Sequence, residues 1–176
     1  MKHLSIILLM LLLVSCGKKN NTFEKYIGER FILPDRMILV PGDADSCFMA
    51  KKSNYKIIAY FDSLGCTPCL FSSSYQWEGL INFTEYYSDR VSTYLFFTPR
   101  KSEQHSLKEY IKSENPFNYP VLFDNEGEIK KNNPWLPDGT FVCLIDSCDI
   151  VVLAGNPMIS NVWEDYKTII KTTKYE

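Results

Sequence analysis

Apolar runs that suit strands alternate with segments whose apolar residues recur at helical spacing. Tyr55–Phe61 is a nearly continuous apolar run rich in strand-forming residues, as expected for a strand that is covered on both faces. Val91–Phe97 has the same character. Between these runs, most apolar residues of segment 66–87 fit the spacing of a helix. The pattern therefore predicts a strand–helix–strand unit.

The second half of the chain continues this alternation. Ser102 is a candidate N-cap for a helix that carries Leu107, Tyr110 and Ile111 on one face. The elements predicted after it are a short extended piece at 119–123, two strands of a hairpin at 140–145 and 150–154, and a last helix from about residue 161. Two short strands are also predicted near the start, at 31–34 and 37–40.

This order of elements predicts an α/β fold. Strands that alternate with helices favour a mostly parallel sheet with helices on both faces, and the final hairpin adds an antiparallel edge. We therefore expect a central mixed sheet flanked by helices, with an N-terminal strand extension.

The first residues resemble a bacterial lipoprotein leader. Lys2 precedes the apolar run 6–14, which is too short to span a bilayer comfortably and ends at the lipobox-like Leu13-Val14-Ser15-Cys16. This resemblance predicts a signal peptide over residues 1–15, a lipidated Cys16 and polar tether over 16–29, and a folded domain over 30–176. An ordinary cleaved signal or an uncleaved anchor is the alternative.

Length and charge narrow the remaining possibilities. A chain of 176 residues with 45% apolar content suits one domain with a substantial core. The net charge of −2 arises from mixed signs without a basic block, so nothing supports nucleic-acid binding. The 11 Tyr and 11 Phe lie mostly inside apolar runs, where core packing explains them better than base stacking.

The cysteines point to thiol chemistry outside the cytoplasm. Cys66 and Cys69 are three residues apart at a predicted helix start, where their sulfurs can bond and where free backbone N–H groups stabilise a thiolate. Pro68 suits such a first turn because it lacks an N–H group. Cys66 is therefore the expected nucleophile, and Cys69 the cysteine that resolves the mixed disulfide.

The same cysteine pair could also be half of a zinc site or a structural disulfide. Zinc needs two more ligands, but Cys143 and Cys148 lie five residues apart across a predicted hairpin, and His105 is the one histidine after the leader. We therefore expect no metal. Cys143, in the middle of an apolar strand, is expected to be a buried small hydrophobe.

Four features follow one another along the chain: a strand, the Cys66-Thr67-Pro68-Cys69 motif at a helix start, the Tyr-Pro-Val-Leu-Phe-Asp piece, and a terminal hairpin before a helix. In these features the chain resembles the thioredoxin superfamily, over roughly residues 30–172. The nearest branch is the extracytoplasmic, membrane-tethered TlpA/ResA-like one. The resemblance implies a thioredoxin-like fold, no organic cofactor, and disulfide exchange with protein thiols. A membrane thiol carrier would be the electron donor.

The resemblance also implies a substrate platform. The family places a cis-proline directly before the strand that faces the dithiol, and its backbone pairs with the substrate peptide. Here Gly139 precedes Thr140, and Pro137 is the nearest proline, so Pro137, Gly139 and Thr140 are the candidate substrate-binding residues. The chain departs from the family in having Gly65 where a tryptophan is usual, and Tyr60 where many members have a carboxylate.

The sequence thus predicts a lipid-anchored thiol–disulfide oxidoreductase of the cell envelope that faces the periplasm or extracytoplasmic space, and that is a reductase or isomerase rather than an oxidase. One alternative is a redox-inactive binding or assembly module in which Cys66 and Cys69 form a structural disulfide. A thiol peroxidase is a weaker alternative, with Thr67 and the distant Arg100 as its only supporting residues. Trp135 could line a substrate groove, and His105 is expected to be solvated.

Overall fold

A six-stranded mixed sheet forms the centre of the protein. The computed structural model describes residues 23–34, 38–40, 52–62, 74–114 and 116–172. Its sheet order is β1-β4-β3-β2-β5-β6, formed by β1 (Ile38–Val40), β2 (Tyr55–Phe61), β3 (Val91–Phe97), β4 (Val121–Phe123), β5 (Thr140–Asp146) and β6 (Val151–Ala154). The three inner strands β4, β3 and β2 are parallel, and the pairings outside them are antiparallel.

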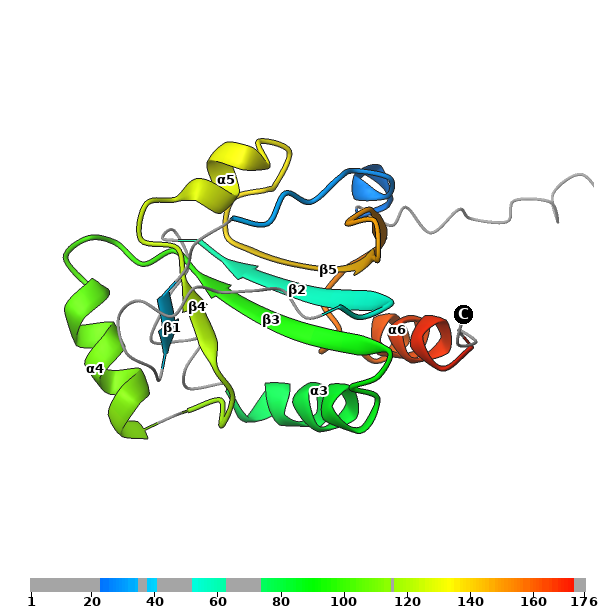
Figure 1. The fold of residues 1–176 in the computed structure, drawn as a ribbon, viewed down its shortest axis with the longest axis horizontal. Helices are drawn as coiled ribbons and strands as arrows, with labels where there is room; N and C mark the ends of the chain where they lie inside the picture. The colour runs from blue at the N-terminus through cyan, green and yellow to red at the C-terminus, as the bar shows by residue number, and fades with distance from the viewer. Residues whose placement is uncertain (1–22, 35–37, 41–51, 63–73, 115, 173–176) are drawn as a thin grey trace, which may run out of the picture.

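Helices cover both faces of this sheet (Figure 1). The larger layer contains α3 (Tyr75–Tyr86), α4 (Gln104–Glu114) and α6 (Ser160–Thr172), and the opposite face carries α5 (Glu128–Asn132) and the 3-10 helix η2 (Glu24–Tyr26). The predicted α/β fold with a mixed central sheet is therefore confirmed. Among the described helices, none is both long and apolar enough to cross a membrane.

Strand β2 shows why its sequence is apolar at almost every position. Ile57 and Phe61 point into the core under α3 and α6, whereas Ile58 and Tyr60 point into the core on the other face. Tyr60 is only 1% exposed. Because both faces are covered, alternation between apolar and polar residues is lost, and Tyr60 is a core aromatic residue.

The hairpin and the last helix lie where the sequence predicts them. Strands β5 and β6 pair antiparallel, and Cys143 at their centre is fully buried. Burial raises the pKa of the Cys143 thiol, so this residue is the small hydrophobe that the sequence indicates. Tyr166 and Ile170 of α6 are also fully buried.

The N-terminal segment differs from its prediction. Residues 31–34 are described and form no strand. Next to them, Arg30 and Ile150 form an isolated bridge. Phe31 instead inserts into the core and stacks on Phe96, with ring centroids 6.5 Å apart. Its backbone N–H donates to the carbonyl of Asp149 at 2.8 Å, so this segment lies along the edge of the sheet without forming a strand. The second short strand is confirmed as β1.

Two details of the helices also differ. Helix α4 begins at Gln104, two residues after the predicted cap Ser102, and its Tyr110 is 43% exposed while Leu107 and Ile111 are buried. The stretch after β4 contains α5, which the sequence does not predict, because a five-residue helix shows no periodicity. Asp124 starts this helix by accepting hydrogen bonds from the backbone N–H groups of Glu128 and Ile129, at 2.8 and 2.9 Å.

The end of the predicted tether packs on the domain. Residues 24–26 form η2, and Tyr26 is 9% exposed. The Tyr26 ring meets Phe141 edge-on with centroids 4.9 Å apart, and the Phe23 ring lies 6.3 Å from Phe141. The described part of the chain therefore contacts the core from its first residue.

Asn133 joins the N-terminal segment to α5 and supports a prediction about stability. Its side chain is fully buried, accepts a hydrogen bond from Ile32 N–H (2.7 Å), and donates to the carbonyls of Ile32 (2.9 Å) and Ile129 (2.8 Å). We expect Asn133→Ala to lower the free energy of unfolding by about 2 kcal/mol, because it leaves buried backbone groups without partners. Urea unfolding measures this, with the exposed Asn132→Ala as control. Equal stability of both variants would contradict it.

Candidate functional site

The candidate site lies at the edge of the sheet where β2 ends. The predicted nucleophile Cys66 and resolving Cys69 fall in the connection from β2 to α3, within residues 63–73, and lie outside the described residues. The predicted lipidation site Cys16 also lies outside them. What the structure shows is the framework around this connection: the last residues of β2 and the residues that lead into β5.

Asp62 and Gly139 hold these two segments together. The backbone N–H of Asp62 donates to the carbonyl of Gly139 at 3.2 Å, and the backbone N–H of Gly139 donates to Oδ2 of Asp62 at 2.6 Å. Gly139 has a φ of +87°, a conformation that glycine adopts readily. A proline, whose φ is fixed near −65°, would not fit this backbone. The position before β5 is therefore built for glycine, and Pro137 lies half-buried two residues earlier.

Thr140 begins β5 beside the end of β2, and its side chain is exposed. The backbone groups of Gly139 face β2, and the carbonyl of Val142 accepts a hydrogen bond from Gly155 N–H on the opposite side, at 2.9 Å. Because neighbouring residues of a strand direct their backbone groups to opposite sides, those of Thr140 face away from β2. They lie beyond Ala154, the end of β6, which pairs with Cys143. The geometry of Thr140 thus suits backbone pairing with an extended segment.

Beneath this edge, Tyr60 occupies the position at which the resembling family often has a carboxylate. Burial raises the pKa of the Tyr60 hydroxyl, and a hydrogen bond with Thr98 opposes the rise. Negative charge on Asp62, Asp124 and Asp138 raises the same pKa further. The phenol therefore stays protonated at neutral pH and can donate a hydrogen bond, but it does not act as a base.

Sequence reasoning did not single out Thr98 or Asp124, and it left Asp62 without a role. Thr98 follows β3, and its Oγ1 lies 3.5 Å from Oδ2 of the buried Asp124, which follows β4. All three residues directly follow a strand of the parallel layer, which is the sequence signal that could have grouped them. The contact between Asp62 and Gly139 spans 77 residues, and no local pattern predicts it.

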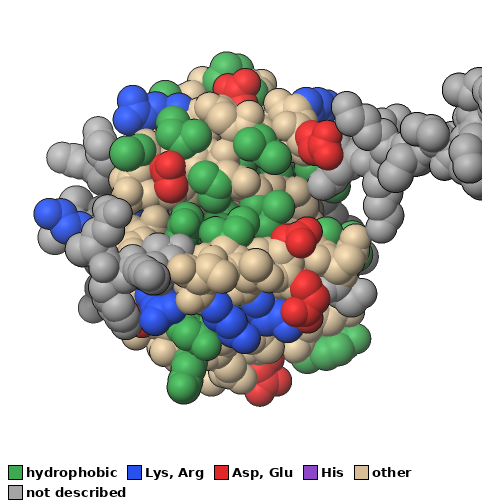
Figure 2. Space-filling view, turned by 90° about the vertical axis from the view of Figure 1, so that its right-hand side faces the viewer, with side chains coloured by type: hydrophobic (Ala, Val, Ile, Leu, Met, Phe, Trp, Pro, Cys, Tyr) green, Lys and Arg blue, Asp and Glu red, His purple; other side chains and the backbone are tan. Residues whose placement is uncertain are grey.

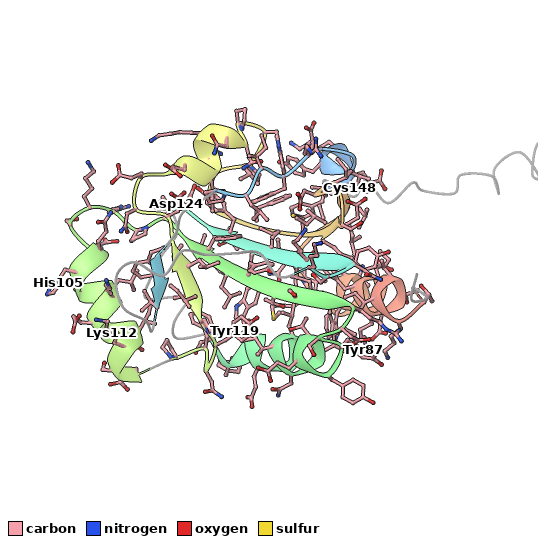
Figure 3. The ribbon with its side chains drawn as sticks, in the orientation of Figure 1. Tyr87, His105, Lys112, Tyr119, Asp124 and Cys148 are labelled. Atoms are coloured by element: carbon pink, nitrogen blue, oxygen red, sulfur yellow. The ribbon has the colours of Figure 1, made fainter. Side chains whose placement is uncertain are left out.

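Other candidate residues lie elsewhere (Figure 3). His105 is exposed on α4, as expected, and Cys148 is exposed on the turn between β5 and β6. Since β5 runs from Thr140 to Asp146, this turn lies at the opposite end of the sheet from Gly139. Within the described ranges, no cluster of three or more His, Cys, Asp or Glu residues could hold a metal ion.

Trp135 packs beside the N-terminal segment. Its ring meets Phe31 and Phe141 edge-on, with centroids 6.0 and 5.8 Å apart, and its Nε1 donates to the carbonyl of Arg30 at 3.3 Å. These contacts indicate that Trp135 is a partly buried packing residue.

The end of the molecule that carries α6 shows basic and acidic side chains next to each other (Figure 2). On α6, Lys167 pairs with Glu164 at 2.6 Å. Just before β3, Arg90 lies 3.7 Å from Asp89. This surface has the mixed charge that the sequence indicates.

Comparison with known proteins places the fold. No family model matches the sequence, and no curated protein matches it. Among solved structures, the chain is similar to the exposed lipoprotein thioredoxin Etrx1 of Streptococcus pneumoniae, with 16% identity and a TM-score of 0.51 over 69% of this chain and 87% of that one. A domain of a possible thiol-disulfide isomerase from Cytophaga hutchinsonii is 14% identical, with a TM-score of 0.56 over 84% of this chain and 97% of that one. StoA of Bacillus subtilis is 20% identical, with a TM-score of 0.50 over 68% of this chain and 84% of that one.

These likenesses confirm the thioredoxin-like fold that the sequence predicts.

Proposed function

We propose that this protein is a lipid-anchored thiol–disulfide oxidoreductase that exchanges disulfides with extracytoplasmic protein thiols through Cys66 and Cys69, and that it works as a reductase or isomerase. The observation that carries this proposal is the place of the cysteine pair in the fold. In the sequence, Cys66 and Cys69 fall between β2 and α3, and β2 ends at Phe61, one residue before the Asp62 that contacts Gly139. In parallel sheets, sites form at this carboxyl edge.

The reaction would proceed by two exchange steps. The thiolate of Cys66 attacks one sulfur of a substrate disulfide, which forms a mixed disulfide and releases the other substrate sulfur as a thiolate that takes up a proton. Cys69, deprotonated, then attacks the sulfur of Cys66 and releases the second substrate thiol. The substrate is reduced by two electrons, and Cys66 and Cys69 become a disulfide. A membrane thiol carrier would return them to the dithiol.

The substrate platform would be the backbone of Thr140, with Pro137 and Gly139 shaping its approach. Thr140 is exposed and its backbone groups face away from β2, which supports this role because main-chain pairing with an extended peptide needs such a strand edge. Location in the cell envelope rests on the Leu13–Cys16 pattern and on likeness to solved proteins of which one is described as an exposed lipoprotein.

A second candidate is a redox-inactive binding or assembly module with a structural disulfide between Cys66 and Cys69. The observation in its favour is the conformation of Gly139, which has a positive φ that proline cannot adopt. The family that the sequence resembles has a proline directly before this strand. Neutral Tyr60 in place of a carboxylate points the same way.

The pKa of Cys66 and the reduction potential of the pair separate the two candidates. For the full chain in detergent micelles, we expect the alkylation rate to report a Cys66 pKa below the ordinary thiol value, and a potential near that of thioredoxin, about −270 mV. A potential above about −150 mV would instead indicate an oxidase. A potential below about −300 mV together with an unshifted pKa would indicate a structural disulfide and contradict the proposal.

A further inference from the structure

We propose that Asp62 is a positioning residue for protein substrates, and this inference rests on the proposed exchange function. The carboxylate of Asp62 holds Gly139, and with it the Thr140 strand edge, at a fixed place beside the end of β2. Asp62 therefore sets how well the protein handles disulfides in polypeptides, whereas its effect on small disulfides is slight.

The hydrogen bonds at Asp62 depart from a regular strand ladder in one respect. Phe61 pairs with Thr140, so the next pair along the two strands is Asp62 with Gly139. Pairs in a regular antiparallel ladder alternate between hydrogen-bonded and non-hydrogen-bonded ones, and the two residues of a hydrogen-bonded pair exchange two backbone hydrogen bonds. Here the first is made, from Asp62 N–H to Gly139 carbonyl, but Gly139 N–H donates to the side chain of Asp62 at 2.6 Å.

This substitution has a structural consequence. Because the carboxylate of Asp62 accepts from the N–H of Gly139, the two segments stay joined one residue pair beyond Phe61 and Thr140. A hydrogen bond to an ionised acceptor is also shorter and stronger than one to a carbonyl. Asp62 thus fixes the start of β5 with one side chain.

The position of this contact links it to substrates. Thr140 is the residue next to Gly139, and its backbone groups face away from β2. An extended protein segment that pairs there depends on the orientation of Thr140, because a small misplacement of bound groups costs much of the gain from positioning. A small disulfide has no main chain to pair and reaches the cysteines without this edge.

The test compares two substrates across three variants of the full chain. Asp62→Ala removes the acceptor, Asp62→Asn keeps an oxygen that accepts from Gly139, and Asp138→Ala removes the neighbouring carboxylate, whose partner is Lys130 at 3.1 Å. The substrates are insulin, as a disulfide-bonded protein, and glutathione disulfide. For Asp62→Ala we expect kcat/KM for insulin to fall about 10-fold, mainly through KM, and kcat/KM for glutathione disulfide to change less than about two-fold.

The other variants complete the test. Asp62→Asn should recover most of the insulin activity, and Asp138→Ala should resemble the wild type with both substrates. Equal losses for both substrates in Asp62→Ala, or no loss for either, would overturn the inference. A wild type that reduces neither substrate contradicts the proposed function itself. In that case the NMR chemical shift of the Gly139 amide still tests the hydrogen bond between Gly139 N–H and the Asp62 side chain. An identical shift in wild type, Asp62→Asn and Asp62→Ala would refute this hydrogen bond.

Discussion

Cys66→Ser should reduce disulfide-exchange activity to the background rate, a loss of roughly a thousand-fold or more. A serine hydroxyl stays protonated at neutral pH, and its oxygen forms no disulfide, so neither exchange step can begin. Reduction of insulin by the full chain in the presence of dithiothreitol measures this loss. Reduced Cys69→Ser incubated with insulin after removal of dithiothreitol should accumulate a mixed disulfide with the substrate, because the resolving thiol is missing.

The other described cysteines are not expected to replace Cys66. Cys143 is fully buried, and burial raises its pKa, which keeps it a protonated thiol. Cys148 is exposed but lies at the end of the sheet opposite to Gly139. Cys148→Ser is therefore the matched control and should retain wild-type activity. Substantial activity in Cys66→Ser would contradict the assignment of the nucleophile.

The second large effect is a loss of stability at alkaline pH. Burial raises the pKa of the Cys143 thiol from an ordinary value of 9.0, and burial together with the nearby Cys143 raises the pKa of the Tyr166 hydroxyl well above 10.0. At Cys143 and Tyr166 the folded protein therefore keeps protons that the unfolded chain releases above these values. Since the unfolded state binds fewer protons there, stability is fully present below pH 9 and falls as pH rises.

The size of this loss follows from the two ordinary pKa values. Each group contributes about 1.4 kcal/mol per pH unit above the pKa of its unfolded state, so by pH 11 the free energy of unfolding should fall by about 4 kcal/mol. Urea unfolding between pH 7 and 11 measures it. Cys143→Ala should have a shallower decline, and the exposed Cys148→Ala should keep the wild-type slope. A free energy of unfolding that stays constant from pH 9 to pH 11 would refute the prediction.

The sequence predicts the elements whose pattern is local. β2 and β3 are found at their predicted bounds because both faces of the sheet are covered, which leaves a continuous apolar run that can be recognised in the sequence. Helix α5 is too short to show periodicity, and its start depends on the side chain of Asp124. The apolar residues at 31–34 suggest a strand, but the structure has only the isolated bridge between Arg30 and Ile150 there, with the Phe31 ring packed on Phe96.

The candidate site divides in the same way. The cysteine pair and the start of β5 can be recognised because motif and strand pattern lie within a few residues. The contact between Asp62 and Gly139 joins residues that are far apart in the sequence, and it depends on a backbone conformation that only the folded protein shows. The candidate reacting groups are therefore easier to recognise in the sequence than the groups proposed to position them.

With the lipid anchor that we propose at Cys16, the packing of η2 would limit how far the domain can extend from a bilayer. A tether that ran freely from Cys16 to Arg30 would have 14 residue steps and a maximum length of about 50 Å. Because Phe23 and Tyr26 pack against Phe141, only seven steps remain, or about 25 Å. With Cys16 in the lipid layer, the domain would stay within roughly its own diameter of the membrane surface. Substrates held near that surface would then be encountered far more often than proteins diffusing freely in the surrounding space.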